Sequence, residues 1–143
     1  DPVLDHLRDL HRDRSRRVLR RMGGRWPAHG TGIGKAILAY STPLVVEQIL
    51  ATGLPRISER TISTPGLFTA ELARIRERGI AYDLEESRAG VACVASPVLG
   101  LNGQVVAGLS VSGWHNRINL DHSAAAVRTA ALSLSRYLSM RSS

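Results

Sequence analysis

Two stretches of the chain carry residue types whose spacing could support chemistry. In the first, Gly30-Thr-Gly-Ile-Gly-Lys35-Ala36, three alternating glycines precede the only lysine of the sequence. Glycines and a lysine at a helix start can hold a phosphate through backbone N–H groups. The phosphate-loop pattern, however, requires a glycine where His29 stands and a serine or threonine where Ala36 stands, which argues against nucleotide hydrolysis. Two interpretations remain open: a helix N-terminus that holds a carboxylate or another polar group, and a close contact between a helix and a strand.

The second stretch, Gly108-Leu-Ser110-Val-Ser112, approaches the G-x-S-x-G pattern of serine hydrolases. Its fifth residue is serine, and the segment lies within a predicted strand, without the strand-turn-helix that exposes a nucleophile, so a serine hydrolase is not expected. Cys93 would act as a nucleophile only if a neighbouring base lowered the pKa of its thiol, and its apolar strand favours packing instead.

The other candidates for catalysis or metal binding have unfavourable spacing. Glu85 and Glu86 are neighbours whose side chains diverge on an extended chain, so a glycosidase pair is not indicated and both are expected to be solvated. No histidine lies four residues from another or near a pair of cysteines; the five are His6, His11, His29, His115 and His122. We therefore expect neither a metal site nor a cofactor.

The elements that position these residues centre on a predicted hairpin between residues 90 and 113. Its arms are Val91–Leu99 and Gln104–Gly113, and Asn102-Gly103 between them is expected to supply the positive φ values of a tight turn. Successive side chains of the second arm point to opposite faces of the hairpin. Val106, Gly108, Ser110 and Ser112 point to one face, which is mostly small and hydroxylated. Val105, Ala107, Leu109 and Val111 point to the other face, which is apolar. The hydroxylated face is the candidate wall of a site.

Helices are predicted around this hairpin. Apolar spacing, proline starts and glycine stops place them at 2–10, 31–40, 43–53, 65–78 and 120–138, whereas arginines mask any periodicity in 13–25. A short strand at 80–84 puts Asp83 on the face opposite Tyr82 and Leu84. The apolar stripe of the last helix is expected to be Ala124, Val127, Ala131, Leu134 and Leu138. The fold class predicted is α+β, with a mainly antiparallel sheet.

Composition bounds the function. A chain of 143 residues with 43% hydrophobic residues fits one globular domain, and no apolar run approaches the length of a membrane span. One cysteine, no signal peptide and no membrane segment favour a cytoplasmic location. The net charge of +7 arises largely from arginines between His11 and Arg25, for which a solvated or partner-facing segment and direct DNA contact both remain open.

Four blocks of the sequence resemble, in order and spacing, the effector-binding domain of IclR-family transcriptional regulators. They are Pro27–Ala36, Gly79–Glu86, Gly90–Val98 and Leu109–Gly113, and the resemblance runs from about Arg17 to the C-terminus. It implies a GAF-like domain with a central antiparallel sheet flanked by helices. It also implies a homodimer or homotetramer and no enzymatic activity. A small-molecule effector would control DNA binding by a winged helix-turn-helix domain.

Carried onto this sequence, the resemblance implies that the ligand contacts are Gly32, Ile33, Asp83, Cys93, Ser110 and Ser112. Backbone N–H groups and hydroxyls donate to carboxylates, which suggests a small organic acid. Asp83 beside an anion would be unfavourable unless it were protonated or accepted a hydrogen bond from the ligand, which suggests a hydroxylated or aromatic acid. Ile33, bulkier than the alanine frequent there, is expected to shrink the pocket or to make it more apolar. Trp114, in place of the usual proline, is expected to reshape the pocket mouth.

The domain organisation expected is a linker helix and basic connector at 1–25 and the effector-binding domain at 26–143. The winged-helix domain is expected to be absent from this chain, which alone would then not bind operator DNA. A β-hairpin that the family carries before His29 is also largely missing. Two other functions remain open: a small GAF-like or hydrolase enzyme using Cys93 or Ser110, and a structural dimerisation module that binds no small molecule.

Overall fold

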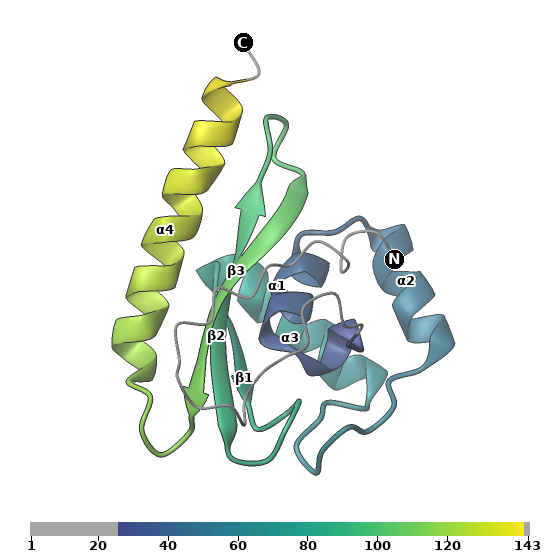
Figure 1. The fold of residues 1–143 in the computed structure, drawn as a ribbon. Coiled ribbons are helices and arrows are strands. Elements are labelled where there is room, and N and C mark those ends of the chain that lie inside the picture. The colour runs from purple at the N-terminus through teal and green to yellow at the C-terminus, as the bar shows by residue number, and fades with distance from the viewer. Residues whose placement is uncertain (1–25, 142–143) are drawn as a thin grey trace.

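The computed structural model describes residues 26–141 and arranges them as a three-stranded antiparallel sheet between helices (Figure 1). The strands are β1 (Ala81–Leu84), β2 (Val91–Leu99) and β3 (Val105–Trp114), in the order β1-β2-β3. The central strand β2 is buried along almost its whole length, as its apolar sequence requires. Pro97, which has no N–H to donate, lies beyond the end of β1, whose pairing with β2 stops at Ala95. The predicted α+β class and antiparallel sheet are confirmed.

The hairpin forms where it was predicted, but its turn has a different geometry. Gly100 N–H donates to the Gln104 carbonyl at 2.8 Å, and Gly103 N–H donates to the Gly100 carbonyl at 3.1 Å. Gly103 has a φ of 74°, whereas Asn102 does not take a positive φ. Three residues, Leu101 to Gly103, therefore close the loop, and only the last needs the left-handed conformation. The expectation that Asn102-Gly103 supplies the positive φ values is therefore met by Gly103 and was wrong for Asn102.

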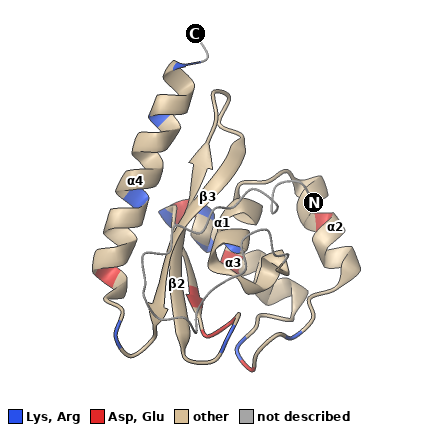
Figure 2. Cartoon of the chain, viewed as in Figure 1, with Lys and Arg blue, Asp and Glu red and all other residues tan. Residues whose placement is uncertain are grey.

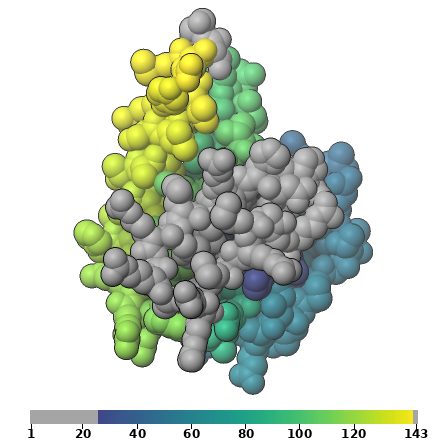
Figure 3. Space-filling view, viewed as in Figure 1, coloured from purple at the N-terminus to yellow at the C-terminus, as the bar shows by residue number. Residues whose placement is uncertain are grey.

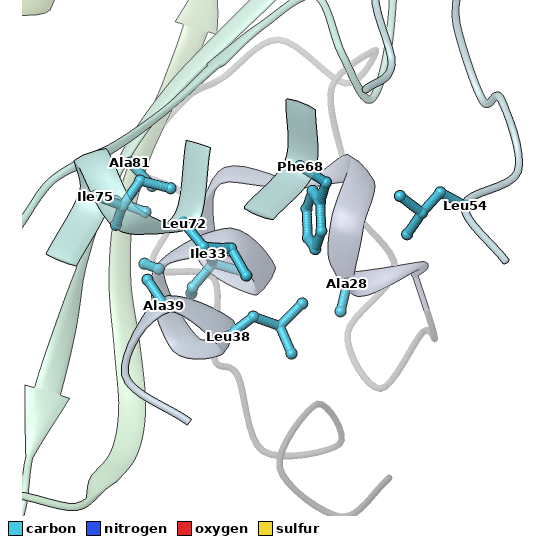
Figure 4. Packing of buried hydrophobic residues seen from close by; sticks show 11 residues of the cluster. Ala28, Ile33, Leu38, Ala39, Leu54, Phe68, Leu72, Ile75 and Ala81 are labelled. Carbon is cyan, nitrogen blue, oxygen red and sulfur yellow. The ribbon is translucent and has the colours of Figure 1, made fainter. Parts of the chain in front are cut away.

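Three helices lie on one side of the sheet (Figure 1). After a short 3-10 turn at Ala28–Gly30, helix α1 (Gly32–Ala39) packs directly on the strands, and α2 (Pro43–Thr52) and α3 (Pro65–Arg78) follow. The last two begin at prolines and end at Gly53 and Gly79, both with positive φ, as the sequence predicted. Figure 4 shows the main hydrophobic core, in which side chains of α1 and α3 meet. The sheet and α3 therefore fix α1 from two sides.

Helix α4 (Leu120–Met140) covers the opposite face of the sheet. Ala124, Val127 and Ala131 are buried, as the predicted stripe required, but Leu134 is 41% exposed and Leu138 is only partly buried. Beside this second half of α4 the sheet consists of β2 and β3 alone, because β1 pairs only with Ala92–Ala95. Figure 3 shows the C-terminal end of α4 beside the hairpin at the top of the molecule. The stripe continues in the sequence, but too little sheet remains to cover it.

Charged residues lie mainly on loops and on the helices, and β2 and β3 carry none (Figure 2). None of the helices between residues 26 and 141 combines the length and hydrophobicity needed to cross a membrane. The predicted helix at 2–10, the undecided segment at 13–25 and the basic cluster within it lie outside the described residues.

Candidate functional site

The sheet aligns three of the predicted site residues in one row across its strands. Asp83 on β1 pairs with Cys93 on β2, and Cys93 pairs with Ser112 on β3. Ser110 lies two residues before Ser112 on β3, opposite Ala95. Its side chain points to the same face as that of Ser112, because side chains alternate along a strand. Ala95 belongs to the core formed with α1, so this face of the sheet is the one that α1 covers. The structure therefore confirms that Ser110 and Ser112 share one face of β3, and it places α1 over that face.

The first turn of α1 sits directly on this row. Thr31 caps the helix, its Oγ1 accepting from Gly34 N–H at 3.0 Å. A methyl group placed on Gly32 would lie 3.1 Å from Cys93 Sγ and 3.5 Å from Asp83 Cβ. The absence of a side chain at Gly32 thus allows the helix start to approach the centre of the row.

Several hydrogen-bond donors at the start of α1 and on β3 have no acceptor among residues 26–141. The N–H groups of Gly32 and Ile33 make no hydrogen bond to any residue between 26 and 141. Ser112 Oγ is buried and has no partner within the described part of the chain. Buried polar groups are nearly always satisfied, so an orphaned hydroxyl beside free helix N–H groups calls for an acceptor from outside. The positive end of the helix dipole makes an anion the suitable acceptor.

Ile33 contributes its backbone to this arrangement, while its side chain fills space beside it. Gly108 on β3 lies beneath the Ile33 side chain, and a methyl group on Gly108 would come within 2.6 Å of Ile33 Cγ1. Ile33 is 8% exposed and belongs to the main core. The Ile33 side chain therefore fills the space between the first turn of α1 and Gly108 on β3, and its effect on a ligand pocket stays a prediction.

Asp83 holds the loop that follows β1, a role that the sequence did not indicate. Its Oδ1 accepts from the N–H groups of Glu86 and Ser87 at 2.8 and 3.2 Å, and its Oδ2 accepts from Ser87 Oγ at 2.5 Å. The carboxylate therefore fixes the loop Glu85–Gly90 that follows β1. Both oxygens already accept hydrogen bonds from the protein, and contact of Asp83 with a ligand stays a prediction.

Sequence reasoning missed a buried ion pair next to the site. Lys35 is fully buried on α1, and its Nζ donates to the Tyr82 carbonyl at 2.6 Å and to Glu86 Oε1 at 2.7 Å. Glu71 Oε1 on α3 lies 3.5 Å from the same nitrogen. Glu86 is only 7% exposed, so the expectation that it is solvated was wrong. The signal was Lys35 itself, because a lone lysine between buried helix residues requires a carboxylate partner.

The two carboxyl groups around Lys35 respond oppositely to this environment. Burial raises the pKa of Glu86 and outweighs the lowering effect of Lys35. Desolvation also opposes ionisation of Glu71, but a hydrogen bond from Arg74 and the charges of Lys35 and Arg78 hold the pKa of Glu71 below its usual value. Glu71 is therefore the more firmly ionised partner.

The outer end of the same loop borders an open cleft of about 590 Å³. Glu85 there accepts from Gly90 N–H at 2.8 Å and lies 3.1 Å from His115 Nδ1 and from Arg60 Nη1. The Gly90 hydrogen bond is the main reason why the pKa of Glu85 is lowered. Trp114 also lines this cleft, two residues from Ser112 on the same face of β3. Its effect on the mouth of an effector pocket stays a prediction.

Residues 26–141 offer little for catalysis. No group of three or more His, Cys, Asp or Glu side chains within this range could hold a metal ion. Cys93 is fully buried in the central strand, where its Sγ donates weakly to the Val94 carbonyl at 3.7 Å. Among the described residues, the site thus consists mainly of hydrogen-bond donors around the first turn of α1.

These features define a small α+β domain whose candidate site is a donor-lined helix start over an antiparallel sheet. The family described as "Bacterial transcriptional regulator IclR C-terminal" matches residues 7–136. The chain is 38% identical over 118 residues to the HTH-type transcriptional regulator BhcR of Paracoccus denitrificans, covering 82% of this chain and 42% of that protein. This chain therefore belongs to the IclR family and corresponds to its C-terminal domain.

Solved structures agree with this assignment. Thermotoga maritima IclR superposes with a TM-score of 0.81 at 31% identity, over 86% of this chain and 51% of that one. The inducer-binding domain of PobR from Acinetobacter, a double mutant in complex with 3-hydroxybenzoic acid, gives a TM-score of 0.73 at 30% identity, over 79% of this chain and 69% of that one. The relatives are transcriptional regulators with effector-binding C-terminal domains, not enzymes, so the alternative of an enzyme using Cys93 or Ser110 is set aside. The chain spans less than half the length of BhcR.

Proposed function

We propose that this chain is the ligand-sensing part of a transcriptional regulator and that it binds a small organic acid at the first turn of α1. The carboxylate accepts from the N–H groups of Gly32 and Ile33 and from the hydroxyls of Ser110 and Ser112. Cys93 and Ile33 form the apolar part of the wall. The single observation that carries the proposal is the buried Ser112 hydroxyl beside the N–H groups of the helix start, none of which has a hydrogen-bond partner between residues 26 and 141.

The chemistry of the donors selects the class of ligand. Amide N–H groups donate only, and a serine hydroxyl can turn its proton toward an acceptor, so together they suit a carboxylate. The PobR domain, which has the same fold, was solved with a hydroxylated aromatic acid. Hydroxy acids and aromatic acids are therefore the first ligands to try.

Binding at this position is proposed to control DNA binding indirectly. The ligand favours one arrangement of protomers in a homodimer or homotetramer, and so sets the spacing of DNA-binding domains that lie outside this chain. Such control requires that the ligand bind one arrangement more tightly than the other. Residues 1–25 are proposed as the linker helix and basic connector, and 26–143 as the effector-binding domain.

A thermal-shift screen with pyruvate, lactate, benzoate and 3-hydroxybenzoate tests the ligand. A ligand at 100 times its Kd stabilises the folded state by about 2.7 kcal/mol, a shift of several degrees in a domain of this size. Ser112→Ala should abolish the shift without lowering the stability of the free protein, because the hydroxyl that it removes is unsatisfied.

Ser135→Ala is the matched control. Ser135 Oγ accepts from Leu99 N–H at 2.9 Å and donates to the Ala131 carbonyl at 2.7 Å, on the other face of the sheet from α1. This variant should lose stability and keep the ligand shift. A ligand shift that survives in Ser112→Ala would place binding elsewhere and count against the site. No shift with any of the acids would favour a structural dimerisation module. Sedimentation with and without ligand then tests the change in assembly.

A further inference from the structure

The ion pair of Lys35 joins the candidate site to the loop Glu85–Gly90. Lys35 Nζ reaches the Tyr82 carbonyl and Glu86 Oε1, while the backbone N–H of Lys35 donates to the Thr31 carbonyl at 3.0 Å. That backbone bond closes the same helical turn whose first N–H groups are free. A single residue therefore fixes the turn through its backbone and ties it to the loop through its side chain.

The loop on the other side of this ion pair is itself firmly held. Glu86 Oε2 accepts from Leu84 N–H at 3.1 Å, and Asp83 accepts from the N–H groups of Glu86 and Ser87. Thr61 Oγ1 donates to the Glu86 carbonyl at 2.7 Å. The loop is thus a rigid support against which the ammonium group of Lys35 can be set.

Stability alone is a weak reason to keep such a pair. Burying an ammonium and a carboxylate costs several kcal/mol per ion, and an apolar replacement of similar size is often as stable. What the pair provides is geometric specificity, because Lys35 can satisfy the Tyr82 carbonyl and Glu86 only when α1 sits in one position above β1. That position is the one that brings Gly32 against Cys93.

We infer that Lys35 is a positioning residue for the effector site: anchored on Glu86 and the Tyr82 carbonyl, it aims the free N–H groups of Gly32 and Ile33 at the ligand carboxylate. This inference rests on the proposed function. Lys35 does not touch the ligand, and its removal reduces affinity by releasing the first turn of α1.

The double variant Lys35→Met/Glu86→Gln removes the ion pair that holds the first turn of α1 while leaving the net charge of the protein unchanged. It removes one positive and one negative charge together, and the glutamine oxygen can still accept from Leu84 N–H. Acetate, the minimal carboxylate, is titrated into the 143-residue chain and followed by the backbone amide signals of Gly32 and Ile33. We expect acetate to bind at least about fivefold more weakly to the double variant.

Arg74→Met is the control. It removes a partner of Glu71 at 2.8 Å on the exposed side of the same charged cluster without touching Glu86, and acetate affinity should stay within about twofold of the parent. A double variant that binds acetate as the parent does would overturn the inference.

Amide hydrogen exchange keeps the two proposals distinguishable. If the parent protein shows no acetate-dependent shifts, the proposed function fails, and the positioning role is decided by exchange at Gly34, Glu86 and Ser87. Faster exchange at these amides in the double variant than in Arg74→Met, compared at equal unfolding free energy, supports the role of Lys35. Equal rates overturn it.

Discussion

The contact between Ile33 on α1 and Gly108 on β3 allows a sharp test of how tightly the helix sits above the candidate site. Gly108→Ala would place a methyl group 2.6 Å from Ile33 Cγ1, 3.3 Å from its Cδ1 and 3.5 Å from Ile37 Cγ1. The first distance is shorter than carbon atoms tolerate. Because Ile33 is 8% exposed and surrounded by core residues, its side chain has little freedom to turn away (Figure 4).

The magnitude follows from two opposing effects. Overpacking a well-filled core costs about 1–3 kcal/mol, whereas replacing glycine by alanine in a strand returns roughly 0.5–1 kcal/mol of backbone entropy. Gly108→Ala should therefore destabilise the parent protein by roughly 1–2 kcal/mol. In an Ile33→Ala background, which itself costs about 2–5 kcal/mol, the obstructing atoms are gone and the new methyl group fills part of the cavity. There Gly108→Ala should be stabilising, so its effect changes sign.

Urea unfolding of the four proteins, followed by circular dichroism, measures this coupling as a double-mutant cycle. The interaction free energy should be about 2 kcal/mol in favour of the double variant, well above the roughly 0.5 kcal/mol scatter expected of independent sites. If Gly108→Ala has the same effect in both backgrounds, α1 does not sit on β3 as described, and the position of its first turn above Ser112 would also be in doubt.

Two further predictions concern α1 and the loop that its Lys35 contacts. Gly34→Ala should destabilise the fold by several kcal/mol in urea unfolding, about 3 or more, because the added methyl group would meet the backbone of Ala28, with its Cα only 2.6 Å away; unchanged stability would contradict this contact. Glu86→Gln should gain stability relative to the parent as pH rises above the usual carboxyl pKa of 4.5. The raised pKa of Glu86 in the folded state gives the parent stability that is lost as pH rises through it, and urea midpoints between about pH 4 and pH 8 measure the difference; a constant gap would refute the direction of the shift.

The elements that local chemistry determines could be predicted from the sequence. The helices α2 and α3 begin at Pro43 and Pro65 and end at glycines with positive φ, so their bounds follow from backbone geometry. Alternation along β3 placed Ser110 and Ser112 on one face, and the structure puts α1 over that face. Their role in binding a ligand stays a prediction.

Features that depend on distant partners could not be predicted. Glu86 is charged and lies in a loop, and nothing near it in the sequence shows that Lys35, 51 residues earlier, is buried beside it. Leu134 continues a correct apolar stripe, yet its burial depends on how far β1 extends along the sheet, which the sequence of α4 does not contain. In each case the hydrophobic or charged character was read correctly, and the missing information was the position of another element.

The glycines before Lys35 show why two interpretations of one motif need not compete. Gly30 faces Ile57 in the connector after α2, Gly32 faces Cys93 and Asp83 in the sheet, and Gly34 faces the backbone of Ala28, so each allows a different element to approach α1. The sequence left open whether these glycines serve a close helix-to-strand contact or an anion site. Because Gly32 has no Cβ atom, the start of α1 can lie directly on the strands. The N–H groups of Gly32 and Ile33, which have no partner between residues 26 and 141, then lie close to the row Asp83, Cys93 and Ser112. The close contact is therefore the physical means by which the proposed anion site is built.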